Sequence, residues 1–239
     1  MTAALLVLAG AADGAARGFV ARQAAQGAVL LTPRDLSRPG WRLRVGDVAA
    51  SVAVAGGRRI PGAGIKGVLT RLPAITPQDL PHIAREDRAY VAAEMTAFLL
   101  AFLSELGSLV ANRPTPPCLC GPAWTATRWR QVARELGFPV EPVRLSTAPE
   151  VPEAGRQGAF VTVLGDTCPG APCPALAHAA TALARAAGVE MLAVEFAHGG
   201  ADAPVRCAHL LPDLAVPGGD EAVLRLFGLG AARSSRALP

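Results

Sequence analysis

The apolar residues in the first half of the chain form short runs that are bounded by glycine, proline and polar residues. Residues 4–8 read ALLVL, and similar runs occupy residues 28–31, 65–70 and 109–111. A run of four to six apolar residues with no polar alternation is typical of a strand that is buried on both faces. The pattern therefore predicts parallel strands in the interior of a layered domain.

Longer apolar patterns predict helices between these strands. Residues 86–106 form the longest such pattern, and Gly107 follows it. Residues 125–136 and 174–187 are closed in the same way by Gly137 and Gly188. A glycine directly after the last periodic residue is a common helix stop, because it adopts the left-handed conformation at little cost.

The second half of the chain predicts a different order of strands and helices. Residues 159–164, 189–196 and 205–210 predict strands, the last two paired around a turn at residues 198–200, and residues 220–227 predict a final helix. A strand pair is also expected earlier, between residues 41–45 and 51–54, followed by a turn at Gly56 and Gly57.

Strands and helices that alternate predict a mostly parallel, layered α/β sheet, and the remainder predicts a smaller α+β unit. We expect an α/β domain over residues 1–145 and an α+β subdomain over residues 159–230. The segment between them, residues 146–158, is rich in Pro, Glu and small residues and indicates a linker. Residues 231–239 are expected to form a flexible tail.

Composition narrows the class of protein. Hydrophobic residues make up 51% of the chain and charged residues 18%, which is typical of a globular protein. The net charge is +4, but the arginines are scattered and aromatic residues make up only 5%, so no nucleic-acid interface is indicated. The many Ala, Arg, Gly and Pro residues favour a bacterial genome of high GC content.

The chain start has no basic segment of the kind that opens a signal peptide. The most apolar stretch, residues 91–110, carries Glu94 and Glu105. Two carboxylates would be costly inside a bilayer, so a buried helix is expected rather than a membrane span. We therefore expect a cytoplasmic protein without a membrane partner.

Several motifs of the chain resemble those of a known family. They are GVLTRLP at residues 67–73, the helix and Asn-Arg-Pro at residues 86–114, RWRQVARELGFPVEPVRLST at residues 128–147, FVTVLGD at residues 160–166 and the helix and strand at residues 183–196. Their order resembles the opening domain and part of the core of the ATP-grasp superfamily, which contains the glutathione-synthetase-like and RimK-like carboxylate–amine ligases. The resemblance implies a pre-ATP-grasp-like domain followed by an ATP-grasp remnant.

The chain departs from that family where the family binds ATP and Mg²⁺. The lysines that grip phosphate would lie between Thr147 and Ala159, where this chain has only a short segment. Glu195 matches the first metal-binding carboxylate of the family, but the Glu-x-Asn pair is replaced by the sequence AHLLP at residues 208–212. The resemblance thus implies a degenerate and shortened relative, which we expect to bind no cofactor; ATP and Mg²⁺ would be used only if it is a ligase.

Candidate binding residues follow the strands of the first half. Arg71 comes after residues 65–70, and Asn112 and Arg113 come after residues 109–111. Ligands of open α/β sheets bind beyond the carboxyl ends of the strands, so these residues could form a cleft for a carboxylate or a phosphate. Alternatively, the arginines cap carbonyl groups or pair with Glu86, Asp87 or Glu94.

A second set of candidates lies on the long helix. Glu86, Tyr90 and Glu94 are spaced at i, i+4 and i+8, so they share one face. Two carboxylates with a phenol could perform acid–base chemistry, but no base accompanies them. Pairing of the two glutamates with neighbouring arginines is the alternative.

The cysteines are candidate metal ligands. Cys118 and Cys120 are separated by one residue and Cys168 and Cys173 by four, and neither spacing is that of a zinc finger. The weak candidates that could converge on one ion are Cys168, Cys173, Cys207 and His209, besides Glu195. The odd number of cysteines, five, favours reduced thiols.

Three functions are consistent with these observations. The favoured one is a non-catalytic ATP-grasp-like protein that acts as a binding or accessory subunit for a partner protein, a second copy of itself or a small anionic ligand. The alternatives are an ATP-dependent carboxylate–amine ligase, which a second subunit could complete, and a cysteine-based metal-binding protein.

Overall fold

The computed structural model describes residues 4–142 and 158–229. The expected tail lies outside the described residues, as does the expected linker apart from Gly158. The helices and strands, in chain order, are β1 (Ala4–Leu8), α1 (Gly14–Arg22), β2 (Ala28–Leu31), α2 (Pro33–Leu36), β3 (Val52–Ala55), β4 (Arg58–Pro61), β5 (Ile65–Thr70), α3 (Arg88–Leu106), β6 (Val110–Ala111), α4 (Ala126–Glu135), β7 (Ala159–Leu164), α5 (Pro174–Ala187), β8 (Met191–Phe196), β9 (Val205–His209) and α6 (Gly219–Leu226).

The first unit is built on a four-stranded parallel sheet with the strand order β2-β1-β5-β6. The predicted parallel, layered architecture is therefore confirmed. Alternate residues of β1 enter two different cores: Leu6 and Leu8 pack with α3, whereas Leu5 and Val7 pack with α1 and α6. The uninterrupted apolar run of β1 is explained by this burial on both faces.

The helix α3 is the core helix of the first unit. Leu99, Phe102, Leu103 and Leu106 are buried against the sheet, and Trp41 meets the rings of Phe98 and Phe102 edge to face. Of the described residues, only the stretch Arg88–Leu109 is long and apolar enough to cross a membrane by length and composition. One side of α3 packs on the sheet, but only 28% of the apolar window is buried, so the buried helix expected from the sequence is confirmed only in part.

A hairpin of β3 and β4 adjoins this sheet. The turn at Gly56 and Gly57 is found where the sequence placed it, and both glycines have positive φ. The expected strand at residues 41–45 is reduced to one bridge between Arg42 and Val52, because β3 pairs with β4 instead.

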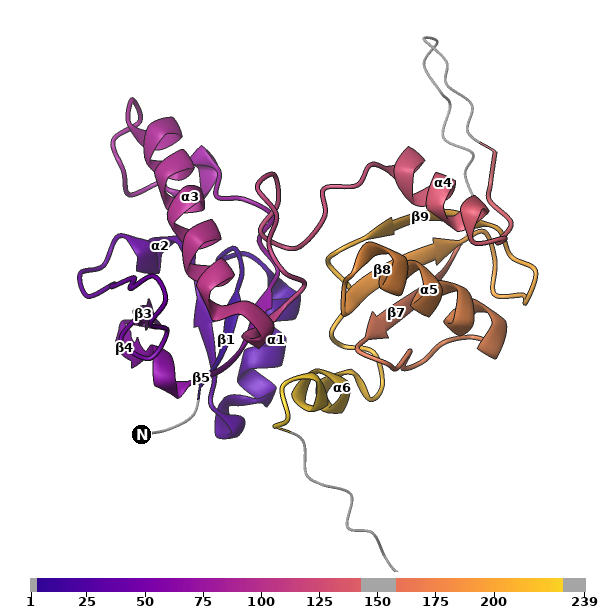
Figure 1. Ribbon diagram of the computed structural model, residues 1–239, viewed down its shortest axis with the longest axis horizontal. Helices are drawn as coiled ribbons and strands as arrows, with labels where there is room; N and C mark the ends of the chain where they lie inside the picture. Colours follow the sequence, from indigo (N-terminus) through magenta and orange to yellow (C-terminus); the bar gives the residue numbers. More distant parts are fainter. Residues whose placement is uncertain (1–3, 143–157, 230–239) are drawn as a thin grey trace, which may run out of the picture.

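The second unit is a three-stranded antiparallel sheet with the order β7-β8-β9. Both α4 and α5 cover one face of it, as Figure 1 shows, and bury Trp129, Leu176 and Leu183 against Val161 and Val194. The predicted first domain, residues 1–145, includes α4, whereas in the structure α4 packs on β9 and α5.

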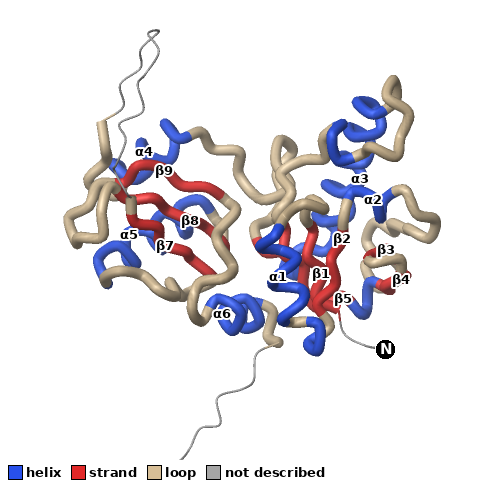
Figure 2. The backbone as a smooth tube through the Cα atoms, turned by 180° about the vertical axis from the view of Figure 1, so that it is seen from behind, coloured by secondary structure: helices blue, strands red, loops and turns tan. Residues whose placement is uncertain are grey.

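The two units share a core. Leu5, Val7 and Leu69 of the first sheet form one apolar cluster with Leu164 and Met191 of the second sheet. The helix α6 lies beside both sheets (Figures 1 and 2) and adds Val223 to the same cluster. A forked ion pair from Arg22 of α1 to Asp220 of α6, at 2.7 and 2.8 Å, fixes the position of the helix.

Candidate functional site

The carboxyl edge of the parallel sheet is where α1 begins. The chain turns after β1, and the Asp13 carboxylate accepts a hydrogen bond from the Ala16 N–H at 2.9 Å, which caps the helix. The same carboxylate accepts a second hydrogen bond from Arg71 Nε, at 2.8 Å. Since β1 and β5 are neighbours and the chain leaves them in opposite directions, this point is the topological switch of the sheet.

Arg71 is a buried residue that joins the two units. It is 8% exposed, and besides Asp13 it donates from Nη1 to the Pro212 carbonyl at 2.6 Å. Burial raises the pKa of Asp13, but the Ala16 N–H and the Arg71 guanidinium outweigh that effect and hold the pKa below its usual value. Asp13 is therefore ionised at neutral pH and neutralises the buried arginine.

Asn112 is also engaged in structure. It has a left-handed backbone (φ 58°) and is 1% exposed. Its side-chain Oδ1 accepts from the N–H groups of Glu190 and Met191, and its Nδ2 donates to the Met191 carbonyl at 2.7 Å. Asn112 thus fastens the end of β6 to the start of β8. The adjacent Arg113 is exposed.

The face of the second sheet that α4 and α5 leave uncovered carries two rows of side chains. The strand register places Phe160, Glu195 and Cys207 in one row and Thr162, Ala193 and His209 in the next. Phe160 is 57% exposed, and its ring lies 6.4 Å from that of His209. The period of two in a strand puts all of these groups on one face.

Glu195 is held by its neighbours on this face. Its Oε2 accepts from Cys207 Sγ at 3.2 Å and its Oε1 from Arg206 Nη1 at 3.4 Å. Arg206 also donates from Nε to Glu141 at 3.0 Å. Burial, together with the nearby Glu195 charge, raises the pKa of the Cys207 thiol to about 11, so the thiol is protonated at neutral pH and donates to the carboxylate.

A cavity of about 470 Å³ lies between this face and the carboxyl edge of the first sheet. Its wall includes Ala15 at the start of α1, Arg71, Phe160, Thr162, His209 and Asp213. Partial burial lowers the pKa of His209, and the Arg71 charge lowers it further, while Glu195 opposes the shift. The imidazole is therefore mostly neutral at pH 7 and gains its proton at a lower pH than an ordinary histidine does.

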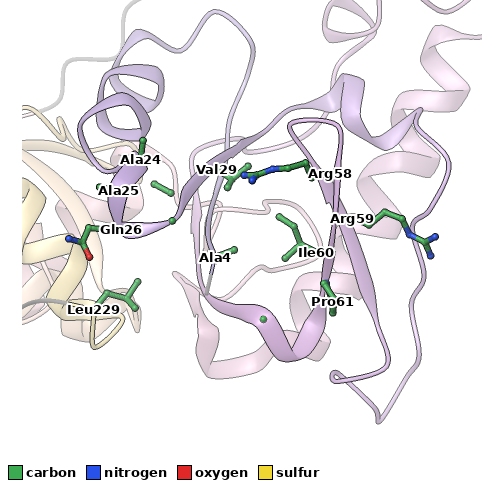
Figure 3. Close-up of a pocket in the computed structure, with 13 residues that line it drawn as sticks. Ala4, Ala24, Ala25, Gln26, Val29, Arg58, Arg59, Ile60, Pro61 and Leu229 are labelled. Atoms are coloured by element: carbon green, nitrogen blue, oxygen red, sulfur yellow. The ribbon is translucent and has the colours of Figure 1, made fainter. Parts of the chain in front are cut away.

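A larger cavity, of about 650 Å³, lies at the opposite edge of the first sheet (Figure 3). It is lined by Ala4 and Ala28, which open β1 and β2, and by Arg58, whose side chain reaches toward Val29. Because this is the amino edge of the parallel strands, and because its polar groups do not converge, the smaller cavity is the better candidate for a ligand site.

The structure brings together only part of the residues that the sequence singled out. Arg71 and His209 line the smaller cavity, and Glu195 lies in the next row of side chains. Asn112 is not in the cavity wall and binds the start of β8 instead. Glu94 and Tyr90 are exposed on α3, whereas Glu86 lies in the turn before the helix begins at Arg88, so the expected helix face shared by all three is wrong. None of the three lines either cavity. Cys168 instead lies against Thr181 and Ala177 of α5, and Cys173 precedes that helix.

Other residues of the site were not predicted from the sequence. Asp13 carries a signal that could have been read, because an Asp three residues before the first buried helical position is a typical cap. Phe160 and Arg206 carry no such signal, since their role depends on which face of β7 and β9 stays uncovered.

A magnesium site requires several oxygen ligands close together. Among the residues that the structure describes, no three His, Cys, Asp or Glu side chains lie close enough together to hold a metal ion. On the uncovered face the two rows supply one carboxylate, Glu195, and its oxygens already accept from Cys207 and Arg206. Because Mg²⁺ takes hard oxygen ligands, these residues do not fit a magnesium site.

The chain is thus a two-sheet α/β protein with a cavity between its sheets. The ATP-grasp ligase PsnB complexed with minimal precursor has the same fold, with a TM-score of 0.62 and 12% identity over 95% of this chain and 99% of that one. PsnB complexed with minimal precursor, Mg and ADP matches with a TM-score of 0.63 and 14% identity, over 96% and 98% of the two chains. At this identity the likeness establishes the fold alone.

No protein-family model matches the sequence. No curated protein matches it either. The expected ATP-grasp-like fold is thus supported by structure rather than by sequence similarity.

Proposed function

We propose that this chain is a non-catalytic binding protein on an ATP-grasp-like fold, which takes a small anionic ligand in the cavity between its two sheets. The observation that carries the proposal is that both carboxylate oxygens of Glu195 already accept hydrogen bonds. The carboxylate that would have to hold a metal is hydrogen-bonded by a thiol and a guanidinium, while His209 occupies the next row.

The charges around the cavity support an anion as the ligand. Arg71 lines the cavity, and its two bonds to Asp13 and Pro212 leave further guanidinium N–H groups that can donate. His209 adds a positive charge when it is protonated. Asp213, also in the wall, restricts the site to ligands that avoid its carboxylate.

The proposal is tested by calorimetry with mono- and dicarboxylates, phosphate and ATP with Mg²⁺. We expect a small anion to bind more tightly at pH 5.5 than at pH 7.5, because acid protonates His209. The His209→Gln variant should lose this pH dependence, and His198→Gln, which changes an exposed histidine outside the cavity wall, should keep it. Equal affinity at both pH values in the unmodified protein would contradict the role given to His209.

The ligase is the alternative, and the fold match to PsnB motivates it. A ligase would release ADP from ATP and Mg²⁺ when a carboxylate and an amine are supplied. We expect no ADP release above that of a denatured control. Turnover by the purified chain, or by the chain together with a co-purifying subunit, would overturn the non-catalytic assignment.

An accessory role predicts a protein partner or a homodimer. Light scattering on the purified chain separates a monomer from a dimer, and mass spectrometry of affinity-purified complexes tests for a second protein. A monomer without partners would leave the small anion as the ligand of this proposal.

A further inference from the structure

The wall of the smaller cavity is mostly apolar. Its apolar side chains come from two strands of the second sheet and from the segments that precede α5 and α6, and they include Phe160, Ala193, Pro169, Leu211 and Val216. A few polar groups stand among them, chiefly Arg71 and His209. Sites for small molecules are typically apolar cavities of about 300–1,000 Å³ in which a few polar groups orient the ligand. The cavity of about 470 Å³ has this composition and this size.

Phe160 is the residue that constrains the ligand most. Four large apolar side chains are exposed in the described part of the chain, and Phe160 is the one among them that lines a cavity. Its ring lies beside that of His209, with the two planes tilted by 58°. A ligand that covers these rings removes apolar surface from water, and a flat ring gains further from an offset or edge-to-face arrangement with them.

Two connecting segments pack together on another side of the cavity. Pro169 and Gly170 lie between β7 and α5, and Val216 lies between β9 and α6. A Cβ built on Gly170 would be 3.8 Å from Pro217, which is an ordinary contact distance, so the two segments touch. Proline, glycine and valine side chains carry no polar group, so this part of the wall offers a ligand only apolar side chains.

The charges of the wall favour a ligand with one negative charge. Arg71 is buried and already forms an ion pair with Asp13, with 2.8 Å between Nε and Oδ2. The Asp213 carboxylate, also in the wall, accepts from the Ala215 N–H at 2.9 Å. A single carboxylate can bind the remaining N–H groups of the guanidinium, whereas a second negative charge on the ligand would be repelled by Asp213.

We infer that the ligand of this cavity is an aryl monocarboxylate, whose carboxylate binds Arg71 and whose ring lies against Phe160. The inference rests on the proposed function, because it concerns the same cavity and adds the chemistry of the rest of the anion. Arg71 anchors the ligand, and Phe160 selects a ring over a small polar body.

The test is calorimetry on the full chain at pH 7.5 with benzoate, acetate, succinate and benzyl alcohol. Benzoate should bind at least about tenfold more tightly than acetate, because its ring buries much more apolar surface than a methyl group. Succinate should bind no better than acetate, since its second carboxylate meets Asp213. Benzyl alcohol has the ring but no charge for Arg71, so it should bind more weakly than benzoate.

Variants then locate the ring. Phe160→Ala should weaken benzoate binding by roughly threefold to tenfold, the contribution of one aromatic pair, and leave acetate binding unchanged. Leu136→Ala also shortens an exposed apolar side chain, but outside the cavity, so it should bind benzoate as the unmodified protein does. Circular dichroism shows whether both variants are folded.

The possible results separate this inference from the proposed function. Equal affinities for acetate and benzoate would overturn the inference and leave the anion site in place, and so would unchanged benzoate binding in a folded Phe160→Ala variant. Benzyl alcohol that binds as tightly as benzoate, or the failure of every anion to bind, would contradict both.

Discussion

The position of Asn112 requires both a left-handed backbone and a side chain that can donate and accept hydrogen bonds. Its backbone is left-handed, which asparagine tolerates better than most residues, and its side chain supplies both a donor and an acceptor to the start of β8. No other side chain of this size offers both groups and the backbone tolerance. The residue therefore holds the seam through geometry rather than through charge.

Replacing Asn112 separates these two requirements. Asn112→Gly keeps the backbone free of strain but leaves the buried N–H and carbonyl groups of Met191, and the N–H of Glu190, without their side-chain partner, which should lower the free energy of unfolding by ~2–3 kcal/mol. Asn112→Ala adds the cost of a Cβ in the left-handed region, so it should be worse by about 1 kcal/mol. Urea unfolding followed by circular dichroism measures both values. A stable Ala variant would show that the hydrogen bonds at the seam contribute little.

The pair of Asp13 and Arg71 makes stability depend on pH. Because the pKa of Asp13 is lower in the folded protein than in the unfolded chain, its stabilisation is complete above the unfolded value of about 3.9. It is lost as the pH falls through the lower folded value. Acid should therefore weaken the seam by protonating Asp13.

The Asp13→Asn variant tests this linkage. Asparagine still caps α1 but leaves the Arg71 charge unneutralised, so the variant should lose about 1–3 kcal/mol at pH 7. Its stability should then depend less on pH below pH 4 than that of the unmodified protein. Unfolding free energies measured from pH 2.5 to pH 7 give both slopes, and parallel curves would exclude Asp13 as a source of acid sensitivity.

Sequence reasoning located Arg71 and Asn112 but not their partners. Each residue directly follows an apolar run that predicts a strand, so the sequence alone places both at the carboxyl edge of the sheet. Their partners Pro212 and Met191 lie 141 and 79 residues away in the chain. A pairing over such distances depends on how the two units dock, and no local pattern encodes it.

At the scale of elements, β5 and the end of α6 pack closely against each other. A Cβ built on Gly67 of β5 would overlap the ring of Phe227, the residue that follows α6. The absence of a side chain at position 67 thus lets α6 approach the sheet and join the shared core. Glycine inside a strand lowers stability by itself, so we attribute the glycine at position 67 to the close packing of Phe227.

Gly67→Ala should therefore displace α6 and destabilise the protein by about 1–3 kcal/mol. In a Phe227→Ala background the same methyl group has room, and its cost should fall close to zero or become favourable. The coupling energy from the four proteins of this cycle, measured by urea unfolding, isolates the contact. Additive effects would mean that Gly67 is not needed for the packing of Phe227.

The elements themselves were largely predictable, and their partners were not. The long pattern at residues 86–106 was found as α3, which begins two residues later, at Arg88. The helix α4 was found too, but its amphipathic pattern identifies a buried face and not the sheet that covers it. That is why the expected boundary after residue 145 separates α4 from β9, on which it packs.

The whole molecule is held together by a core that neither unit completes alone. Leu5 and Leu69 come from the first sheet and Leu164 and Met191 from the second, and α6 closes the cluster. The bonds of Arg71 and Asn112 cross the same seam. Two sheets that share apolar residues in this way should unfold as one cooperative unit.

The tryptophans allow this cooperativity to be measured. Trp41 lies in the first unit, whereas Trp124 and Trp129 contact each other in the second. In the Trp41→Phe variant, fluorescence therefore reports on the second unit only, while far-UV circular dichroism reports on the whole chain. We expect the two thermal midpoints to coincide. Val223→Ala, which removes methyl groups from the shared core, should lower the free energy of unfolding by ~1–2 kcal/mol and shift both midpoints down together. A fluorescence midpoint that differs from the circular dichroism midpoint would mean that the units unfold separately, and the cavity between them could then open without loss of either sheet.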